Sequence, residues 1–411
     1  MEGKIGKNCA SYPCNSDINQ TQGKGIFFTK VVCTAALAHL LNDLIQSMLP
    51  AIFPMLKLQF ALTFSQVGLI ALVYQITASL LQPWIGLYTD KRPIPYLLPC
   101  GMAITLLGII VLATASSYSI ILVSSAIIGV GSATFHPEVS RVARMASGGK
   151  FGTAQSTLQV GGSIGSAFGP LLAASIIIPN GQYSIAWFGL AAAFAILLLY
   201  SLKNWTLSHG NKQLTFINNH LSPGLQRREV IQAIPVVCVL IFAKFVYISS
   251  FTNYFTFYLI EKFGVSVQQS QIYLFVFLIS IAIGTLFGGF VGDRIGRRTV
   301  IWVSFLGVAP FALSLPYANF FWTGILVSVI GLVMSSAFSA LVVYAQEAIP
   351  GRVGLISGLM FGLMFGISGI GAAGLGQLAD KYGVLWVYTF TSFLPLLGFL
   401  TVFLPKSRKT E

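Results

Sequence analysis

Gly289-Phe-Val-Gly-Asp293-Arg-Ile-Gly-Arg-Arg298 is a basic stretch that follows a long apolar run, and a related stretch occurs earlier in the chain. The earlier stretch is Gly86-Leu-Tyr-Thr-Asp90-Lys-Arg92, which also follows a long apolar run. The offset between the two is 203 residues, measured either from Gly to Gly or from Asp to Asp. A repeat at about half the length of the chain predicts two halves built on the same plan.

The composition around these stretches is that of a membrane protein. Of the 411 residues, 55% are hydrophobic and only 9% are charged, whereas a soluble domain has about 25% charged residues. So few charges cannot cover a soluble protein of this size. The five Cys have no framework spacing. The composition therefore excludes a cytosolic enzyme, a disordered scaffold and a disulfide-stapled secreted domain, and it favours a chain embedded in a lipid bilayer.

A membrane-spanning helix needs about 20 mostly apolar residues, and twelve such runs are separated by Gly, Pro or charged clusters. They lie near 30–56, 65–88, 94–115, 119–144, 151–178, 184–203, 230–261, 267–291, 298–316, 321–348, 353–379 and 384–404. The sequence thus predicts an all-α membrane protein with twelve transmembrane helices in two pseudo-symmetric six-helix bundles. The polar segment 205–229 is the expected cytoplasmic linker between bundles at 26–204 and 230–405, with tails at 1–25 (disordered) and 406–411.

The basic residues predict the orientation. If the N-terminus is cytoplasmic, 20 of the 24 Lys and Arg lie on the cytoplasmic side, and only Lys57, Lys262 and Lys381 lie outside. Cytoplasmic loops carry such an excess of positive charge, so both termini are expected in the cytoplasm. The same loops account for the net charge of +13, and we expect no nucleic-acid partner.

The repeated loop stretch resembles the signature of the major facilitator superfamily. His39-Leu-Leu-Asn-Asp43, Phe135-His-Pro-Glu138 and Tyr344-Ala-Gln-Glu347 further resemble the fosmidomycin resistance proteins, over nearly the whole chain beyond the tail. This resemblance implies proton-driven drug efflux by alternating access, of anionic phosphonates such as fosmidomycin, across a bacterial inner membrane. The first loop departs from the pattern, because Pro93-Ile-Pro95 stands where the second has Gly296-Arg-Arg298.

The first span carries a polar face. Asp43 lies 13 residues into the run, which is about 20 Å along a helix and so near mid-membrane. His39, Asn42, Asp43 and Gln46 share one helical face. A charged side chain at this depth costs about 2.5–3.5 kcal/mol and indicates function by default. We expect Asp43 and His39 to couple protons; the alternative is an interhelical hydrogen-bond cluster without a transport role.

Lys244 occupies the equivalent place in the seventh span. We expect it to pair with Asp43 and to bind an anionic substrate, whose arrival would weaken the pair and favour protonation of Asp43. The alternative is a static ion pair that only specifies helix packing. Further candidates for substrate binding are the polar residues Asn42, Gln46, Gln75 and Gln159, and the aromatic stripe Tyr247, Phe251, Tyr254 and Tyr258.

His136, Glu138 and Arg141 lie near the cytoplasmic end of the fourth span. Glu138 and Arg141 are three residues apart and can pair locally. This polar turn either lines the mouth of the cavity or caps a helix end.

The loop residues and glycines suggest a gate. Asp90, after Gly86, could dock on the start of the eleventh span beside Arg352, and Asp293, after Gly289, on the start of the fifth. Arg297 could reach Glu347; alternatively these charges only enforce topology. Two sets of glycines at four-residue spacing predict close helix packing at the bundle interface: Gly161, Gly165 and Gly169, and Gly358, Gly362 and Gly366.

These observations favour a proton-coupled exporter of a small drug-like compound. A symporter or exporter of a native metabolite is the alternative. A membrane enzyme is disfavoured, because no nucleophile–base group or phosphate-cradling loop is present and the four His lack metal-site spacing. We expect small-molecule substrate and protons as partners, no metal, no cofactor and a monomer.

Overall fold

The computed structural model describes residues 28–92, 94–148, 150–218, 227–295, 297–336 and 353–403, and every regular element within them is a helix. Ten helical segments in these ranges are long and apolar enough to cross a membrane. Two shorter apolar helices, Leu97–Ala113 and Phe320–Ser335, complete the twelve expected spans. The chain is therefore a multi-pass membrane protein.

The first half contains the spans up to the predicted linker. Its helices are α1 (Thr29–Ala51), α2 (Phe53–Gln59), α3 (Phe64–Lys91), α4 (Leu97–Ala113), α5 (Tyr118–Ala133), α6 (Phe135–Ala146), α7 (Phe151–Leu172), a π turn (Ala173–Ile177), α8 (Ile178–Asn180), a 3-10 turn (Gln182–Trp187) and α9 (Phe188–Asn218). The second half repeats this plan. Its helices are α10 (Arg227–Phe263), α11 (Val267–Ile295), α12 (Arg297–Leu306), α13 (Ala309–Ser314), a 3-10 turn (Leu315–Tyr317), α14 (Phe320–Ser335), α16 (Val353–Tyr382), α17 (Val384–Thr391) and a 3-10 segment (Leu394–Phe403).

Prolines explain where three predicted spans are each divided into two helices. Pro54, Pro137 and Pro310 lie in the first turns of α2, α6 and α13. Proline is tolerated there because the first N–H groups of a helix have no partner within the helix. Each pair of helices still forms one apolar span: Thr29–Gln59, Tyr118–Ala146 and Thr299–Tyr317.

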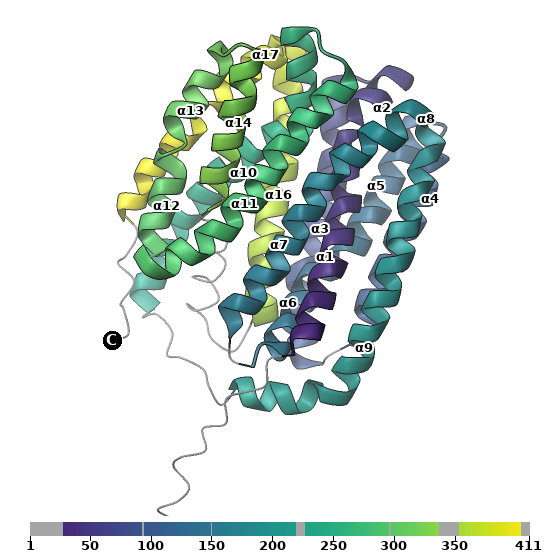
Figure 1. Ribbon diagram of the computed structural model, residues 1–411, viewed down its shortest axis with the longest axis vertical. Helices are drawn as coiled ribbons and strands as arrows, with labels where there is room; N and C mark the ends of the chain where they lie inside the picture. Colours follow the sequence, from purple (N-terminus) through teal and green to yellow (C-terminus); the bar gives the residue numbers. More distant parts are fainter. Residues whose placement is uncertain are drawn as a thin grey trace, which may run out of the picture.

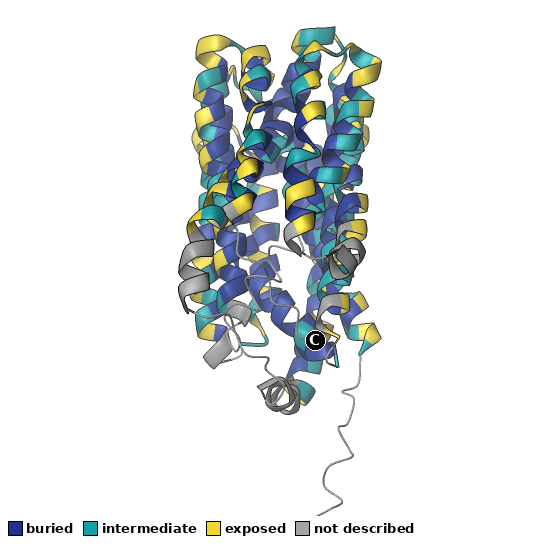
Figure 2. Cartoon of the chain, turned by 90° about the vertical axis from the view of Figure 1, so that its left-hand side faces the viewer, coloured by how far each residue is buried: buried dark blue, intermediate teal, exposed yellow. Residues whose placement is uncertain are grey.

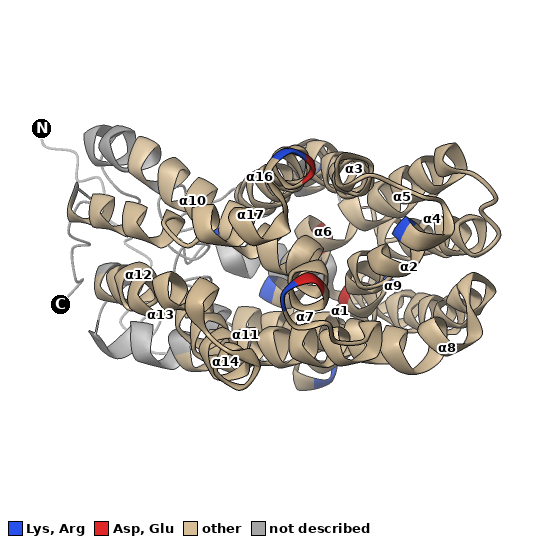
Figure 3. Ribbon diagram, turned by 90° about the horizontal axis from the view of Figure 1, so that it is seen from above, with Lys and Arg blue, Asp and Glu red and all other residues tan. Residues whose placement is uncertain are grey.

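The two halves stand side by side with their helices along the long axis (Figure 1). Seen along that axis, α1 to α9 gather on one side and α10 to α17 on the other (Figure 3). The halves meet where α3 packs against α16 and α7 against α11. Buried positions line the inner helix faces (Figure 2), while large apolar side chains such as Trp84, Leu197 and Tyr317 remain exposed. This outward apolar surface is what a lipid environment requires.

Both glycine sets bring helices into close contact, but only one lies between the halves. On α7, a Cβ at Gly165 would lie 1.9 Å from the carbonyl oxygen of Leu40, so this set packs α7 on α1 within the first half. On α16, a Cβ at Gly358 would lie 2.5 Å from the carbonyl oxygen of Gln82 on α3, in the other half. The expectation that both sets lie at the bundle interface is therefore correct for α16 and wrong for the α7 set.

The predicted linker begins as a helix. The sixth predicted span, the last of the first half, does not stop at residue 204, because α9 continues to Asn218. Trp205 holds this extension by packing edge-on against Phe28 at 5.3 Å and stacking on His209 at 5.5 Å between ring centroids. Residues 219–226 lie outside the described part of the chain.

Candidate functional site

A cavity of about 220 Å³, mostly apolar but with a group of polar side chains on its wall, lies between the two halves. Its walls come from α1, α2, α3, α6 and α7 of the first half and from α10, α11, α14 and α16 of the second. Seven of the predicted site residues line it: His39, Asp43, Gln46, Gln75, His136, Gln159 and Lys244. The polar face of the first span thus meets the equivalent span of the other half across a shared space.

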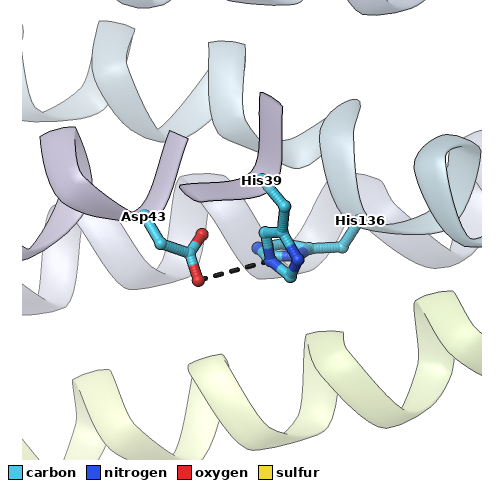
Figure 4. A group of neighbouring side chains, drawn as sticks. All are labelled: His39, Asp43 and His136. Carbon is cyan, nitrogen blue, oxygen red and sulfur yellow. Dashed lines mark ion pairs between the residues drawn. The ribbon is translucent and has the colours of Figure 1, made fainter. Parts of the chain in front are cut away.

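His39 and Asp43 form the centre of the site, one turn apart on α1 (Figure 4). His39 Nδ1 lies 2.8 Å from the carbonyl oxygen of Leu158 on α7, and His39 Nε2 lies 3.3 Å from Asp43 Oδ2. The other carboxylate oxygen, Oδ1, accepts a hydrogen bond of 2.9 Å from the side chain of Asn42. Asn42 is buried and does not line the cavity, so it supports the pair rather than the wall.

One shared proton would satisfy this geometry. A carbonyl oxygen only accepts, so Nδ1 of His39 carries a hydrogen and donates it to Leu158. In a neutral ring, Nε2 then has no hydrogen, and its lone pair faces the carboxylate of Asp43. A carboxylate oxygen 3.3 Å from a nitrogen lone pair is unfavourable unless a hydrogen lies between the two atoms. Either His39 is protonated beside ionised Asp43, or Asp43 is protonated and donates to His39.

His136 brings a third group from α6. One ring nitrogen of His39, one of His136 and one carboxylate oxygen of Asp43 lie within 4.8 Å of one another. The His136 ring meets His39 edge-on at 5.3 Å and stacks on Phe361 of α16 at 5.1 Å between centroids. Spacing along the chain did not reveal this grouping, because it does not show that α1 and α6 meet. Distance alone also admits a divalent cation, but one proton already completes the His39–Asp43 contact, and we assign no metal site.

Lys244 lines the cavity from α10 and has no hydrogen-bond partner for its ammonium nitrogen within the described residues. Its side chain is 0% exposed, and Nζ has no hydrogen-bond partner among the described residues. The predicted ion pair with Asp43 is not formed: within the described ranges, the ion pair of Asp43 is with His39. The reason is local, since His39 and Asn42 already satisfy the carboxylate from its own helix. Lys244 and Asp43 instead face the same cavity from opposite halves.

Glutamines complete the polar wall. Gln46 donates to Ser132 Oγ at 2.8 Å and accepts from the hydroxyl of Tyr74 at 2.5 Å, so its amide is held in one orientation. The Oε1 atoms of Gln75 and Gln159 are buried and lack partners in the part of the chain that is described. Two unsatisfied acceptors on a cavity wall are available to a ligand.

The aromatic stripe of α10 lies elsewhere. Tyr247, Phe251, Tyr254 and Tyr258 are buried and do not line the cavity. Phe251 stacks on Phe277 at 4.4 Å between ring centroids, and Tyr254 donates to the carbonyl oxygen of Ala372 at 2.6 Å. α10 faces the cavity with Lys244, Ile248 and Thr252 and with their neighbours Phe245 and Asn253, whereas the stripe packs within the second half. We therefore leave these four residues out of the proposed site.

The predicted polar turn of α6 is divided in the same way. His136 faces the cavity, whereas Glu138 and Arg141 do not line it. Both are buried, and Arg141 donates to both carboxylate oxygens of Glu138, through Nε at 3.0 Å and through Nη2. This pair satisfies itself within one helix and does not form the cavity wall.

The predicted gate lies largely outside the described structure. Gly86 is within α3, but the side chains of Asp90, Asp293 and Arg297 are outside the description, although their helices are not. Gly289 lies in α11. Glu347 and Arg352 fall outside the described residues altogether. The gate contacts therefore remain predictions.

Several residues of the site had no signal in the sequence. Phe361 and Phe365 line the cavity and contact His136 from the other half. Gly162 lies against the pair: a Cβ there would be 2.6 Å from His39 Nε2 and 2.7 Å from Asp43 Oδ2. Its place one residue after Gly161 of the predicted set was the only available sign.

A repeated helical membrane protein with a cavity between its halves has the architecture of a secondary transporter. The family model of the Major Facilitator Superfamily matches residues 35–373 and 237–411. The chain belongs to this superfamily, and it is a transporter rather than an enzyme.

Two relatives cover almost the whole chain. The chain is 52% identical over 381 residues to the fosmidomycin resistance protein of Escherichia coli strain K12. The matched region covers 92% of this chain and 93% of the relative. The chain is 43% identical over 396 residues to an uncharacterised MFS-type transporter, YfnC, of Bacillus subtilis strain 168, with 94% and 96% covered.

Solved structures share the fold at low identity. A mutant of the nucleoside transporter NupG matches with a TM-score of 0.68 at 15% identity, over 91% of this chain and 99% of that one. A bacterial homologue of the human lysosomal transporter Spinster, inward-facing and occupied, matches with a TM-score of 0.68 at 14% identity, over 92% and 94%. At these identities the likeness shows the fold alone.

Proposed function

We propose that the chain exports a small anionic compound in exchange for protons. The observation that carries this proposal is the His39–Asp43 contact, which needs one proton and lies on the cavity wall. Loss of this proton would leave a carboxylate oxygen of Asp43 3.3 Å from the nitrogen lone pair of His39. We propose that His39 and Asp43 change their positions or partners when the proton leaves. Proton release is then linked to a change of conformation, as proton-coupled transport requires.

The substrate class rests on Lys244 and on the name of a relative. Lys244 Nζ is a buried donor without a partner among the described residues, and it faces the cavity. An unpaired buried ammonium favours an anionic ligand. The relative at 52% identity is a fosmidomycin resistance protein, and fosmidomycin-like phosphonates carry a negative charge. We propose that the charged end of the compound binds at Lys244 and that Gln75 and Gln159 contact its polar groups.

The proposed setting is a bacterial inner membrane with both termini in the cytoplasm, because the predicted inner loops hold 20 of the 24 basic residues. Viewed from the end opposite the predicted inner loops, the part of the ribbon coloured by residue type carries charged positions in only a few short stretches (Figure 3). One chain supplies both walls of the cavity, so we propose a working monomer of two bundles, 26–204 and 230–405.

The charges of the cavity also favour a second candidate, symport of a proton with an anion. An anion meets less repulsion beside the protonated His39–Asp43 pair than beside a deprotonated one. Proton and anion therefore favour each other while they share the cavity. Exchange requires that they load in different conformations, whereas symport requires only that they load together.

Transport into proteoliposomes distinguishes these candidates. With fosmidomycin as the probe and an imposed pH gradient of either polarity, exchange accumulates the compound in the acidic compartment, and symport accumulates it in the alkaline one. A protonophore should abolish both, and a chelator should change neither. Movement that ignores the pH gradient would contradict proton coupling, and sensitivity to the chelator would favour a metal at the three-residue group.

Gly162→Ala should impair transport by crowding the proton site. A Cβ at this position would lie 2.6 Å from His39 Nε2 and 2.7 Å from Asp43 Oδ2, too close for either atom to stay in place. We expect at least about a tenfold loss of initial transport rate. A destabilisation of the His39–Asp43 contact by about 1.4 kcal/mol is enough for a factor of ten. The measurement is uptake into proteoliposomes at equal protein content.

Gly374→Ala is the matched control. It is also a helical glycine, but a Cβ there meets nothing within 4 Å. Alanine is the better helix former by about 1 kcal/mol, so this variant should transport normally. Equal rates for both variants would show that the position of the pair does not matter for transport.

A further inference from the structure

The start of α3 and the end of α16 are joined across the two halves, at the end of the molecule viewed in Figure 3. Asp380, in the last turn of α16, accepts the backbone N–H of Phe64 on Oδ1 at 2.8 Å and the N–H of Ser65 on Oδ2 at 2.8 Å. The hydroxyl of Ser65 also donates to Oδ2. We call these three contacts the Asp380 latch.

The latch completes the cap of α3. The first N–H groups of a helix have no partner within the helix and must find one elsewhere. Thr63 and Gln66 satisfy each other, with the Thr63 side chain accepting from Gln66 N at 3.1 Å and the Gln66 side chain accepting from Thr63 N at 2.9 Å. The N–H groups of Phe64 and Ser65 are left, and the carboxylate of the other half takes both. A negative charge is also favourable at this end of the helix dipole.

Close packing surrounds the latch. A Cβ at Gly376 would lie 2.6 Å from the carbonyl oxygen of Phe64, so α16 and α3 touch through their backbones. The ring of Phe64 packs edge-on against Phe257 of α10 at 5.1 Å between centroids. Gln271 on α11 donates to the carbonyl oxygen of Ala51 on α1 at 2.6 Å. All these contacts cross between the halves at the same end of the molecule.

We infer that the Asp380 latch is a gate contact that holds the outer end of the transporter closed and must break whenever that end opens. The inference rests on the proposed alternating access and on the proposed orientation. Breaking the latch leaves two N–H groups of α3 without a protein partner, and water replaces the carboxylate. The latch thus biases the equilibrium toward the outward-closed state without touching substrate or proton.

Thiol labelling from outside tests the inference. In a version whose Cys are replaced, Ala71→Cys places one thiol on the cavity wall. Adding Asp380→Ala should raise the rate of labelling by a membrane-impermeant maleimide about tenfold, a shift of about 1.4 kcal/mol. The control is Glu261→Ala, because Glu261 is exposed and makes no ion pair among the described residues. It should stay within about twofold of the parent, since exposed charges contribute little.

A labelling rate for Asp380→Ala equal to that of the parent would overturn the latch. Labelling needs no transport, so failure of proton-coupled efflux would leave this result interpretable. If Asp380→Ala does not accumulate in the membrane, the pair Ser65→Cys with Asp380→Cys provides the second test. Oxidation to a disulfide should stop both labelling and transport, and a reductant should restore them; unchanged transport in the cross-linked protein would equally reject the gate.

Discussion

Asp43→Asn is expected to abolish accumulation driven by a pH gradient. One coupled proton and a gradient of one pH unit support about a tenfold accumulation, since each factor of ten is about 1.4 kcal/mol. The variant should bring this ratio to one. The asparagine amide has the shape of the carboxylate and can donate a hydrogen to His39 Nε2, so the 3.3 Å contact can persist without the shared proton. The measurement is substrate accumulation in proteoliposomes, with protein content in the membrane checked in parallel.

Two controls separate coupling from folding and binding. Glu261→Gln removes a carboxylate that is exposed at the end of α10 and should leave accumulation unchanged. The Asp43→Asn protein should still exchange labelled for unlabelled substrate across the membrane without a pH gradient, because Lys244 and the glutamines remain. Normal accumulation by Asp43→Asn would place the proton elsewhere, with His136 as the next group to change.

The spans and the polar face of α1 could be predicted because both depend on order along one helix. Twelve apolar runs gave the helices, and the spacing of His39, Asp43 and Gln46 placed them on one side of α1, where the cavity lies. The match between halves also located Lys244 on the facing wall. Periodicity identifies a face, and the polar residues on it show that this face meets water.

Contacts between helices could not be predicted in the same way. The partner of Asp43 was expected from the other half, but it is His39, one turn away on the same helix. The aromatic stripe of α10 was expected beside Lys244, but none of its four residues lines the cavity, because α10 faces the cavity with Ile248 and Thr252 instead. His136 and Phe361 meet because α6 and α16 pack together. A single sequence does not determine how a helix is rotated about its axis, because two different rotations can be equally compatible with the same pattern of residues.

Lys244→Met should make the protein more stable and, at the same time, unable to carry an anion. An ammonium buried without a partner costs several kcal/mol, and apolar replacement of buried charges is often stabilising by about 1–4 kcal/mol. Lys244 is 0% exposed, with Nζ unpartnered among the described residues. Methionine fills similar space without the charge. We expect a melting temperature in detergent raised by a few degrees and at least about a tenfold loss of fosmidomycin transport, as for any lost contact above about 1.4 kcal/mol.

Lys262→Met distinguishes a functional lysine from a structural one, because its expected effect on stability has the opposite sign. Lys262, near the end of the same helix, donates to the hydroxyl of Tyr258 at 2.9 Å and to the carbonyl oxygens of Pro316 at 2.8 Å and Ala318 at 2.9 Å. Its removal leaves these acceptors unsatisfied and should lower the melting temperature while transport continues. Lys244 has no hydrogen-bond partner among the described residues, so its charge lowers the stability of the fold. We expect such a cost to be retained where function requires the charge. If Lys244→Met instead lowered the melting temperature and transported normally, Lys244 would be a packing residue, and the anion would need another binding group.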